Sequence, residues 1–232
     1  DPKPGEFFVD GTIGEGGHAL SILEKIGENG RLFCLDLDKY SLEKVQLKIE
    51  REFPISNFQF PIVWKNSNFS EIPEILKQEN LSKADGIILD LGFSSYQIEA
   101  SGRGFSFLRD EPLLMTYDEN QTPAKDLLRE LTEEELVQII RKFGEERFAG
   151  RIARNIKEYI KKNREISTSL ELTEIIKNSV PKYYERGRIH PATRTFQALR
   201  IFANDELGHL EKFLKHLPEI LASEGRVVII SF

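Results

Sequence analysis

The sequence predicts an α/β protein with a doubly wound parallel sheet that is interrupted by an inserted all-helical subdomain. Strand-like and helix-like segments alternate over the first ninety residues, as is typical of parallel strands joined by crossover helices. A glycine-rich loop follows the first of these strands. Between about residue 122 and residue 178 the pattern is helical throughout, which indicates an insertion.

The elements of the sheet domain follow from apolar runs separated by turn residues. Residues 84–91 are apolar between the acids Asp85 and Asp90, as expected for a central strand buried on both faces. The expected strands are 6–13, 31–38, 58–64, 84–91 and 226–232, and the helices between the first four are 17–26, 41–53 and 71–78.

The insertion is expected to begin with a long structured loop over 92–117, which is rich in glycine, serine and aromatic residues. An acidic first turn at 133–135 opens one helix. In a helix over 147–162, four apolar residues fall on one stripe and three arginines on another (Phe148, Ile152, Ile156 and Tyr159; Arg147, Arg151 and Arg154). A last helix is expected over 195–217. The predicted domains are 1–112 and 193–232 for the sheet, with 113–192 inserted.

The composition is that of a globular protein with one large domain and a modest insertion. Of its 232 residues, 40% are hydrophobic and 30% charged. One cysteine and four histidines exclude an internal disulfide and any zinc pattern, so we predict no metal site. No apolar run approaches the length of a membrane span and no signal peptide opens the chain. We therefore expect a cytoplasmic protein, with native sequence beyond both ends.

The charge is unevenly distributed along the chain. The net charge is −6, but residues 141–200 hold fifteen Lys/Arg and seven Asp/Glu, a net of +8, which leaves −14 for the rest. A basic segment on an acidic body fits a face for a charged substrate. Solvated helices would give the same count, so both interpretations stay open.

The loop from Asp10 to His18 indicates a nucleoside-containing cofactor. Its four glycines allow close approach of a ligand to the backbone, and a helix N-terminus follows. Asp36 ends the next strand, where a carboxylate can accept bonds from both ribose hydroxyls. Asp10 suits a ligand that carries a cation, which favours S-adenosylmethionine (SAM) over a dinucleotide such as NAD.

Two further strand ends are candidate site positions, because ligands of parallel sheets bind beyond the carboxyl ends of the strands. Phe69, in the turn after the third strand, is placed either to contact an adenine ring or to pack in the core. Asp90, at the end of the fourth strand, is expected between cofactor and substrate.

Five motifs resemble those of the RsmH/MraW family of SAM-dependent methyltransferases, in order and over essentially the whole chain. They lie at 10–18 (DGTIGEGGH), 89–95 (LDLGFSS), 103–107 (RGFSF), 144–149 (GEERFA) and 190–201 (HPATRTFQALRI). The resemblance implies a Rossmann-like methyltransferase sheet and methyl transfer to the N4 amino group of a cytosine in the decoding region of 16S ribosomal RNA. The family's N-terminal His/Pro segment and its continuation after Phe232 are absent, and Phe93 and Tyr96 depart from its pattern.

The resemblance also implies site residues. The cofactor contacts map onto Gly16, Gly17, His18, Asp36, Phe69, Asp90 and Gln97. The expected partner is small-subunit ribosomal RNA or the assembled small subunit, and a homodimer is possible. The candidate RNA contacts are the arginines of the basic segment, namely Arg147, Arg151, Arg154, Arg186, Arg188 and Arg194.

The chemistry narrows the choice of catalytic residues. Methylation of a cytosine at carbon 5 needs a cysteine nucleophile, and Cys34 lies inside a predicted strand. An exocyclic amine instead needs alignment and hydrogen-bond acceptors, for which Asp90, Ser94 and Ser95 are the candidates. The flipped base needs a flat partner, and the candidates are Phe93, Tyr96, Phe105 and Phe107. The rival hypotheses are a nucleotide-sugar or NAD-dependent oxidoreductase and an RNA-binding assembly factor that keeps SAM as a structural ligand.

Overall fold

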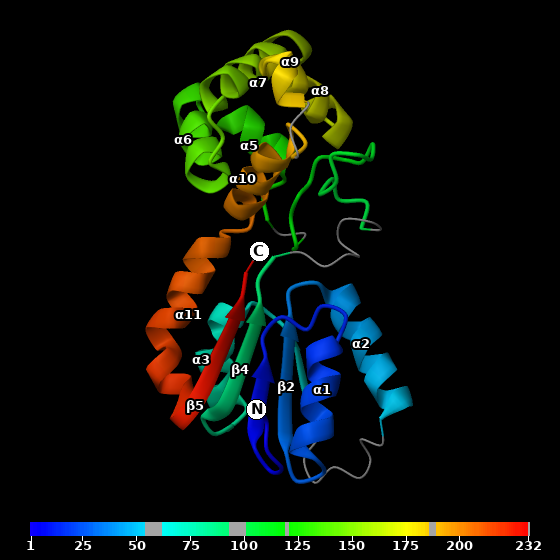
Figure 1. Ribbon diagram of the computed structural model, residues 1–232, viewed down its shortest axis with the longest axis vertical. Helices are drawn as coiled ribbons and strands as arrows, with labels where there is room; N and C mark the ends of the chain where they lie inside the picture. The colour runs from blue at the N-terminus through cyan, green and yellow to red at the C-terminus, as the bar shows by residue number, and fades with distance from the viewer. Residues whose placement is uncertain (54–61, 93–100, 119–120, 186–188, 232) are drawn as a thin grey trace. The chain divides into compact units, whose positions relative to one another are not determined.

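A computed structural model describes residues 1–53, 62–92, 101–118, 121–185 and 189–231. The chain divides into two compact units (Figure 1). The sheet unit comprises residues 1–94 and 207–232, and the helical unit comprises residues 95–206. Among the helices of the described ranges, none is both long and apolar enough to cross a membrane.

The sheet unit holds a five-stranded, entirely parallel sheet in the order β3-β2-β1-β4-β5. Its strands are β1 (Phe7–Asp10), β2 (Arg31–Asp36), β3 (Val63–Asn66), β4 (Ala84–Asp90) and β5 (Leu221–Ile230). The predicted α/β fold class is therefore confirmed. The chain builds outward from β1 to β3 and then returns to the other side of β1, so the strand order reverses between β1 and β4.

Helices cover both faces of this sheet. Successive residues of each strand point to opposite faces, so each strand contributes side chains to both layers of helices. In β2, Leu32 and Cys34 pack in a cluster with α1 (Gly17–Ile26) and α2 (Lys39–Glu52). Phe33 and Leu35 pack in a second cluster with α3 (Ile72–Gln78) and α11 (Glu206–Ile220). All four side chains are buried, which explains why the strands read as continuous apolar runs.

The helical unit consists of short amphipathic helices around its own core. They are α5 (Ala124–Glu130), α6 (Glu133–Gly144), α7 (Ala149–Asn163), α8 (Ser169–Ser179), α9 (Lys182–Glu185) and α10 (Thr193–Ala203). Capping boxes begin two of them, formed by Thr132 with Glu135 and by Thr168 with Glu171. The predicted apolar stripe of α7 is confirmed, since Ile152 and Ile156 are fully buried.

The strand ends differ from those predicted. β1 ends at Asp10 rather than at residue 13, because Gly11 N–H donates to Ile88 O of β4 whereas Ile13 N–H donates to Leu35 O of β2. The chain thus leaves the strand direction within the glycine loop. The predicted strand 58–64 is seen as β3 from Val63 onward, since 54–61 lie outside the described residues. β5 begins at Leu221, five residues before the expected start.

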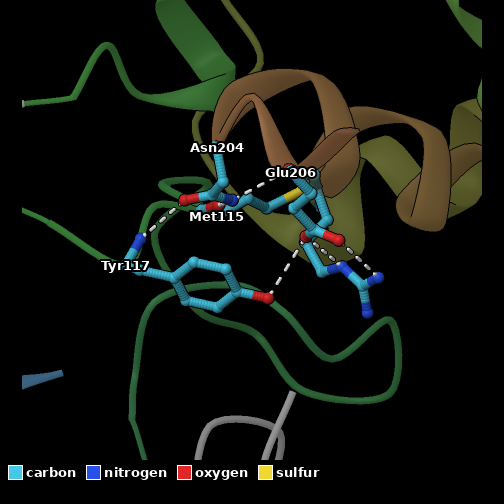
Figure 2. A network of polar contacts seen from close by, with 5 residues as sticks. Met115, Tyr117, Asn204 and Glu206 are labelled. Carbon is cyan, nitrogen blue, oxygen red and sulfur yellow. Dashed lines mark hydrogen bonds and ion pairs between the residues drawn. The ribbon is translucent and has the colours of Figure 1, made fainter. Parts of the chain in front are cut away.

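The single helix predicted over 195–217 is wrong, because the chain forms α10 and α11 with a break at Asn204 and Asp205. The buried amide of Asn204 accepts from Tyr117 N–H over 2.8 Å and donates to Met115 O over 2.8 Å (Figure 2). Asp205 has a φ of +45°, in the left-handed region. These hydrogen bonds to a distant segment end α10. The helical periodicity of the sequence does not predict them, so it does not predict the break.

The structure divides the chain at 94/95 and 206/207, whereas the predicted divisions are 112/113 and 192/193. Part of the predicted loop belongs to the helical unit, because Met115 N–H donates to Arg103 O and Leu113 N–H donates to Ser167 O. α10 belongs there as well. It approaches α6 so closely that a Cβ on Gly144 would lie 2.3 Å from Arg194 O.

Candidate functional site

The loop between β1 and α1 requires glycine at position 16 and has open space at position 17. Gly16 precedes α1 with a φ of +79°, and a Cβ there would lie 2.4 Å from a methyl carbon of Val45. At Gly17 an added Cβ would meet nothing within 4 Å. In the described part of the chain, no side chain caps α1 and its first turn holds no acid. The helix N-terminus thus offers backbone N–H groups to a ligand.

Asp36 ends β2 with its carboxylate held by this loop. Oδ2 accepts the N–H of Gly14 over 2.9 Å, and Oδ1 accepts the N–H of Asp38 over 2.8 Å. Burial raises the pKa of Asp36 from 3.8 to about 6, and these backbone bonds oppose the rise. Each carboxylate oxygen has a second acceptor position, so the group still has capacity for two hydroxyl donors.

Asp10 is a buried acid with an unused acceptor. Its side chain is 1% exposed, and Oδ1 accepts the N–H of Thr12 over 3.2 Å. Oδ2 has no hydrogen-bond partner among the described residues. Burial raises the pKa of Asp10 from 3.8 to about 7, and the charges of Asp36 and Asp90 add to the rise. Such an orphaned carboxylate suits a cationic ligand group.

Asp90 lies at the end of β4 and is tied to the same loop. Its N–H donates to the hydroxyl of Thr12 over 2.6 Å. Its carboxylate Oδ2 lies 3.9 Å from Nε2 of His18, and both side chains are partly exposed. The register pairs Asp10 with Ile88 and with Cys34, and Asp36 with Asn66. The sheet therefore brings the three acids to the carboxyl edge of adjacent strands.

Phe69 begins a short 3-10 helix (η2, Phe69–Glu71) directly after β3. Its ring packs edge-on against Phe213 of α11, with 5.9 Å between centroids. The hydroxyl of buried Ser70 lies 3.1 Å from Nδ1 of His209, also on α11. The Asn68 side chain accepts from Ser70 N–H and caps the turn. Partly buried, Phe69 keeps part of its surface for a ligand.

Five of the predicted site residues lie outside the described residues, namely Ser94, Ser95, Gln97, Arg186 and Arg188. So do the candidate base partners Phe93 and Tyr96. Phe105 and Phe107 are described, and both pack within the helical unit. Phe105 stacks on Tyr117 and Phe107 stacks on His190, with centroids 5.4 Å and 4.4 Å apart.

In the helical unit, Arg147 lies against a group of aromatic rings just before α7. Its guanidinium carbon is 4.9 Å from the ring centres of both Phe148 and Tyr184, and 5.9 Å from that of Tyr183. Arg194 of α10 donates to the Tyr184 hydroxyl over 3.4 Å. We call Arg147, Tyr183, Tyr184 and Arg194 the arginine–tyrosine cluster.

The other two arginines predicted on α7 differ from Arg147. Arg154 forms an ion pair with Glu133 of α6 over 3.6 Å. Arg151 is exposed, one turn before it. The three arginines therefore do not form one uniform basic stripe, because Arg147 precedes the helix and turns to the rings of α9.

Three residues that contact the strand-end acids or the arginine–tyrosine cluster were not predicted from the sequence, namely Thr12, Glu146 and Tyr184. Thr12, which contacts Asp90, was visible only as a hydroxyl inside the glycine loop. Glu146 and Tyr184 lie in or near motifs of the resemblance, but nothing in their spacing predicts that Glu146 is buried beneath the tyrosine. Within the described ranges, no group of three or more His, Cys, Asp or Glu residues is arranged to hold a metal ion.

The fold is that of a Rossmann-like domain, and its candidate site lies at the carboxyl edge of the sheet, where such domains bind ligands. A model of the MraW methylase family matches residues 1–232, and the chain belongs to that family. Ribosomal RNA small subunit methyltransferase H of Syntrophotalea carbinolica is 42% identical over 232 residues, which cover 100% of this chain and 72% of that protein. The protein of the same name from Geotalea daltonii is 44% identical over 235 residues, with the same coverages.

Similarity to solved structures is weaker. One described as a putative rRNA-methylase from Clostridium thermocellum has a TM-score of 0.34 and 19% identity, over 40% of this chain and 46% of that chain. A similarity at this level carries no argument, so the fold assignment rests on the strand order and on family membership.

Proposed function

We propose that this chain transfers the methyl group of SAM to the N4 amino group of a cytosine in the decoding region of small-subunit (16S) ribosomal RNA. The observation that carries the proposal is the meeting of a glycine loop with Asp10, Asp36 and Asp90 at one edge of the sheet. Family membership and the small-subunit RNA methyltransferases that this chain matches at 42–44% identity support the same reaction.

The residues at the strand ends fit the cofactor. Asp36 keeps two acceptor positions for ribose hydroxyls, and the open space beside Gly17 allows a ligand to approach the backbone closely. The orphaned Asp10 oxygen suits the positive charge of SAM. Phe69 would contact the adenine ring, and the proposal includes His18, Asp90 and Gln97 as further contacts. Bound SAM would supply a methyl group activated by the sulfonium.

Asp90 would act on the substrate amine. The amino group of cytosine is flat and poorly nucleophilic, because its lone pair is delocalised into the ring. An acceptor that bonds its N–H favours the tetrahedral geometry of the transition state. The Asp90 carboxylate is partly exposed and its backbone is fixed by Thr12, so it suits this role. Ser94 and Ser95 are proposed as additional acceptors.

The state of Cys34 argues against methylation at carbon 5. Its thiol is fully buried in β2 between two helices, and burial raises its pKa well above the ordinary value. A buried neutral thiol cannot attack a pyrimidine ring, because the thiolate is the nucleophile. This residue therefore does not supply the covalent step that carbon-5 chemistry needs.

A methyl-transfer assay tests the proposed function. The chain is incubated with isotope-labelled SAM and either free 16S RNA or small ribosomal subunits from a strain that lacks the enzyme, and the nucleosides are then separated by mass spectrometry. We expect label in N4-methylcytidine. Label in 5-methylcytidine would contradict the N4 assignment, and SAM binding without transfer to either substrate would support the assembly-factor hypothesis.

A further inference from the structure

The arginine–tyrosine cluster presents flat surfaces that the core does not use. Tyr183 is 63% exposed, although tyrosine rings on a surface normally cover apolar neighbours. Arg147 is exposed as well and lies over the rings of Phe148 and Tyr184. The cluster therefore combines an exposed ring with an exposed planar cation.

The two arginines of the cluster differ in their contacts from other arginines of the helical unit. Other arginines of the helical unit pair with acids, as Arg154 does with Glu133 and Arg200 with Glu206. Within the part of the chain that the structure describes, neither Arg147 nor Arg194 forms an ion pair with a carboxylate, and their contacts are with tyrosine and phenylalanine rings, a hydroxyl and a carbonyl oxygen. The carboxylate of Glu146, bonded to the Tyr184 hydroxyl, offsets part of the two positive charges, and both guanidinium groups can still contact an anionic ligand.

A buried acid holds the side chain of Tyr184 and the backbone at Phe148. Glu146 is 1% exposed, and its carboxylate accepts the Tyr184 hydroxyl over 2.7 Å and the N–H of Phe148 over 2.8 Å. The Tyr184 ring beneath Arg147 is consequently held before any ligand arrives, and the Phe148 ring packs edge-on against it. Preorganisation of this kind lowers the entropic cost of binding.

We propose that the arginine–tyrosine cluster binds an unpaired nucleotide of the RNA substrate. The base stacks on Tyr183 and on the guanidinium of Arg147, and Arg147 and Arg194 attract the phosphate. Single-stranded RNA is recognised by stacking on aromatic rings and guanidinium planes, whereas bases in a duplex are inaccessible. The inference rests on the proposed function and adds that this part of the substrate is single-stranded.

Fluorescence anisotropy with the full chain tests the inference on three probes. The first is a short single-stranded RNA, the second its duplex, and the third a strand of equal length and charge with abasic nucleotides at its centre. Each titration is repeated at several salt concentrations. We expect the wild type to bind the intact strand more tightly than either of the others.

Three variants separate stacking from charge. Tyr183→Ala should weaken binding of the intact strand by about 5- to 150-fold, the range for one stacked base, and leave the salt dependence unchanged. Arg147→Ala should weaken binding and make the salt dependence shallower, with the magnitude of the slope of log K against log salt reduced by about 0.7. Arg147→Lys should keep the slope and lose affinity for the intact strand. Exposed Tyr40 and Lys161 serve as controls, since Tyr40→Ala and Lys161→Ala should bind as the wild type does.

Several outcomes would overturn the inference. If the wild type binds the intact and abasic strands equally, base stacking does not contribute to binding. If Tyr183→Ala binds the intact strand as the wild type does, Tyr183 is not the stacking residue. Equally tight binding of polyglutamate that Arg147→Ala abolishes would assign the cluster to an acidic protein instead. If the cluster passes these tests while no methyl group reaches RNA in the transfer assay, only the proposed function fails.

Discussion

The backbone N–H of Gly14 donates to Oδ2 of Asp36 over 2.9 Å, across 22 positions of sequence. This bond joins the two features that first indicated a cofactor, namely the glycine loop and the acid at the end of the second strand. It also fixes the carboxylate, because the N–H of Asp38 holds the other oxygen. The remaining acceptor positions of Asp36 consequently have defined directions.

Replacement of Asp36 should weaken SAM binding. Asp36→Ala removes two charge-assisted hydrogen bonds to the ribose, so we expect a loss of about 1.5–3 kcal/mol in binding free energy. Isothermal titration calorimetry measures it. Glu43→Ala is a matched control, since Glu43 is exposed on α2 and pairs only weakly with Lys39. Unchanged SAM affinity in Asp36→Ala would show that Asp36 does not bind the ribose and that the cofactor site lies elsewhere.

Replacement of Asp90 should separate chemistry from binding. Asp90→Asn keeps the shape of the side chain and weakens its acceptor strength toward the substrate amine. We expect turnover to fall by about ten- to a hundred-fold, more than SAM affinity falls. Single-turnover methyl transfer and calorimetry on the same variant give the two quantities. Equal losses in both would make Asp90 a cofactor ligand only.

The buried acids should make the cofactor-free protein less stable at high pH. The pKa of Asp10 is raised from 3.8 to about 7 and that of Asp36 to about 6, both chiefly by burial. Between pH 4 and pH 7 the folded state therefore binds more protons than the unfolded state, so the free energy of unfolding falls as the pH rises. The window runs from the ordinary pKa of the unfolded carboxyl to the raised pKa of the folded one, and for Asp10 the charges of Asp36 and Asp90 add to the effect of burial.

Asp10→Asn isolates this effect. At pH 8 the variant should be more stable than the wild type by up to roughly 4 kcal/mol, the free energy that corresponds to the raised pKa. At pH 4 the two should be nearly equal. Urea denaturation at both pH values measures the difference, and a constant difference between the proteins would show that Asp10 does not titrate in this window.

The contact between Ser70 and His209 should support the cofactor site through Phe69. His209→Ala leaves the buried hydroxyl of Ser70 without this partner and loosens the turn that begins at Phe69. We expect SAM affinity to fall about two- to ten-fold, as for one neutral hydrogen bond. His216→Ala is the control, because His216 lies on the same helix and contacts exposed Glu219. A loss equal to that of the control would exclude the role.

The bonds of Asn204 should stabilise the helical unit. Asn204→Ala removes three hydrogen bonds from a side chain that is 1% exposed, those with Tyr117 N–H, Met115 O and Arg200 O (Figure 2). We expect a loss of about 2–4 kcal/mol in the free energy of unfolding. Asn163→Ala, which removes one exposed bond to Tyr159 O, should cost about 0.5 kcal/mol or less.

The sequence alone predicted the sheet, its helices and the acids at the strand ends. Apolar runs such as 84–90 indicate burial on both faces, and Gly14 and Gly16 of the 10–18 loop have a left-handed backbone conformation that other residues rarely adopt. α1 begins and ends where the periodicity places it. These features are local, since a run, a turn or a cap depends on neighbouring residues.

Only the tertiary structure decided how distant residues combine. The break between α10 and α11 depends on a bond from Asn204 to residues about ninety positions earlier. The charge state of Asp10 depends on the strands that bury it, and the exposed position of Arg147 depends on rings from α9. Hydrophobic periodicity does not predict such contacts, because they join residues that lie at no characteristic distance from each other in the sequence.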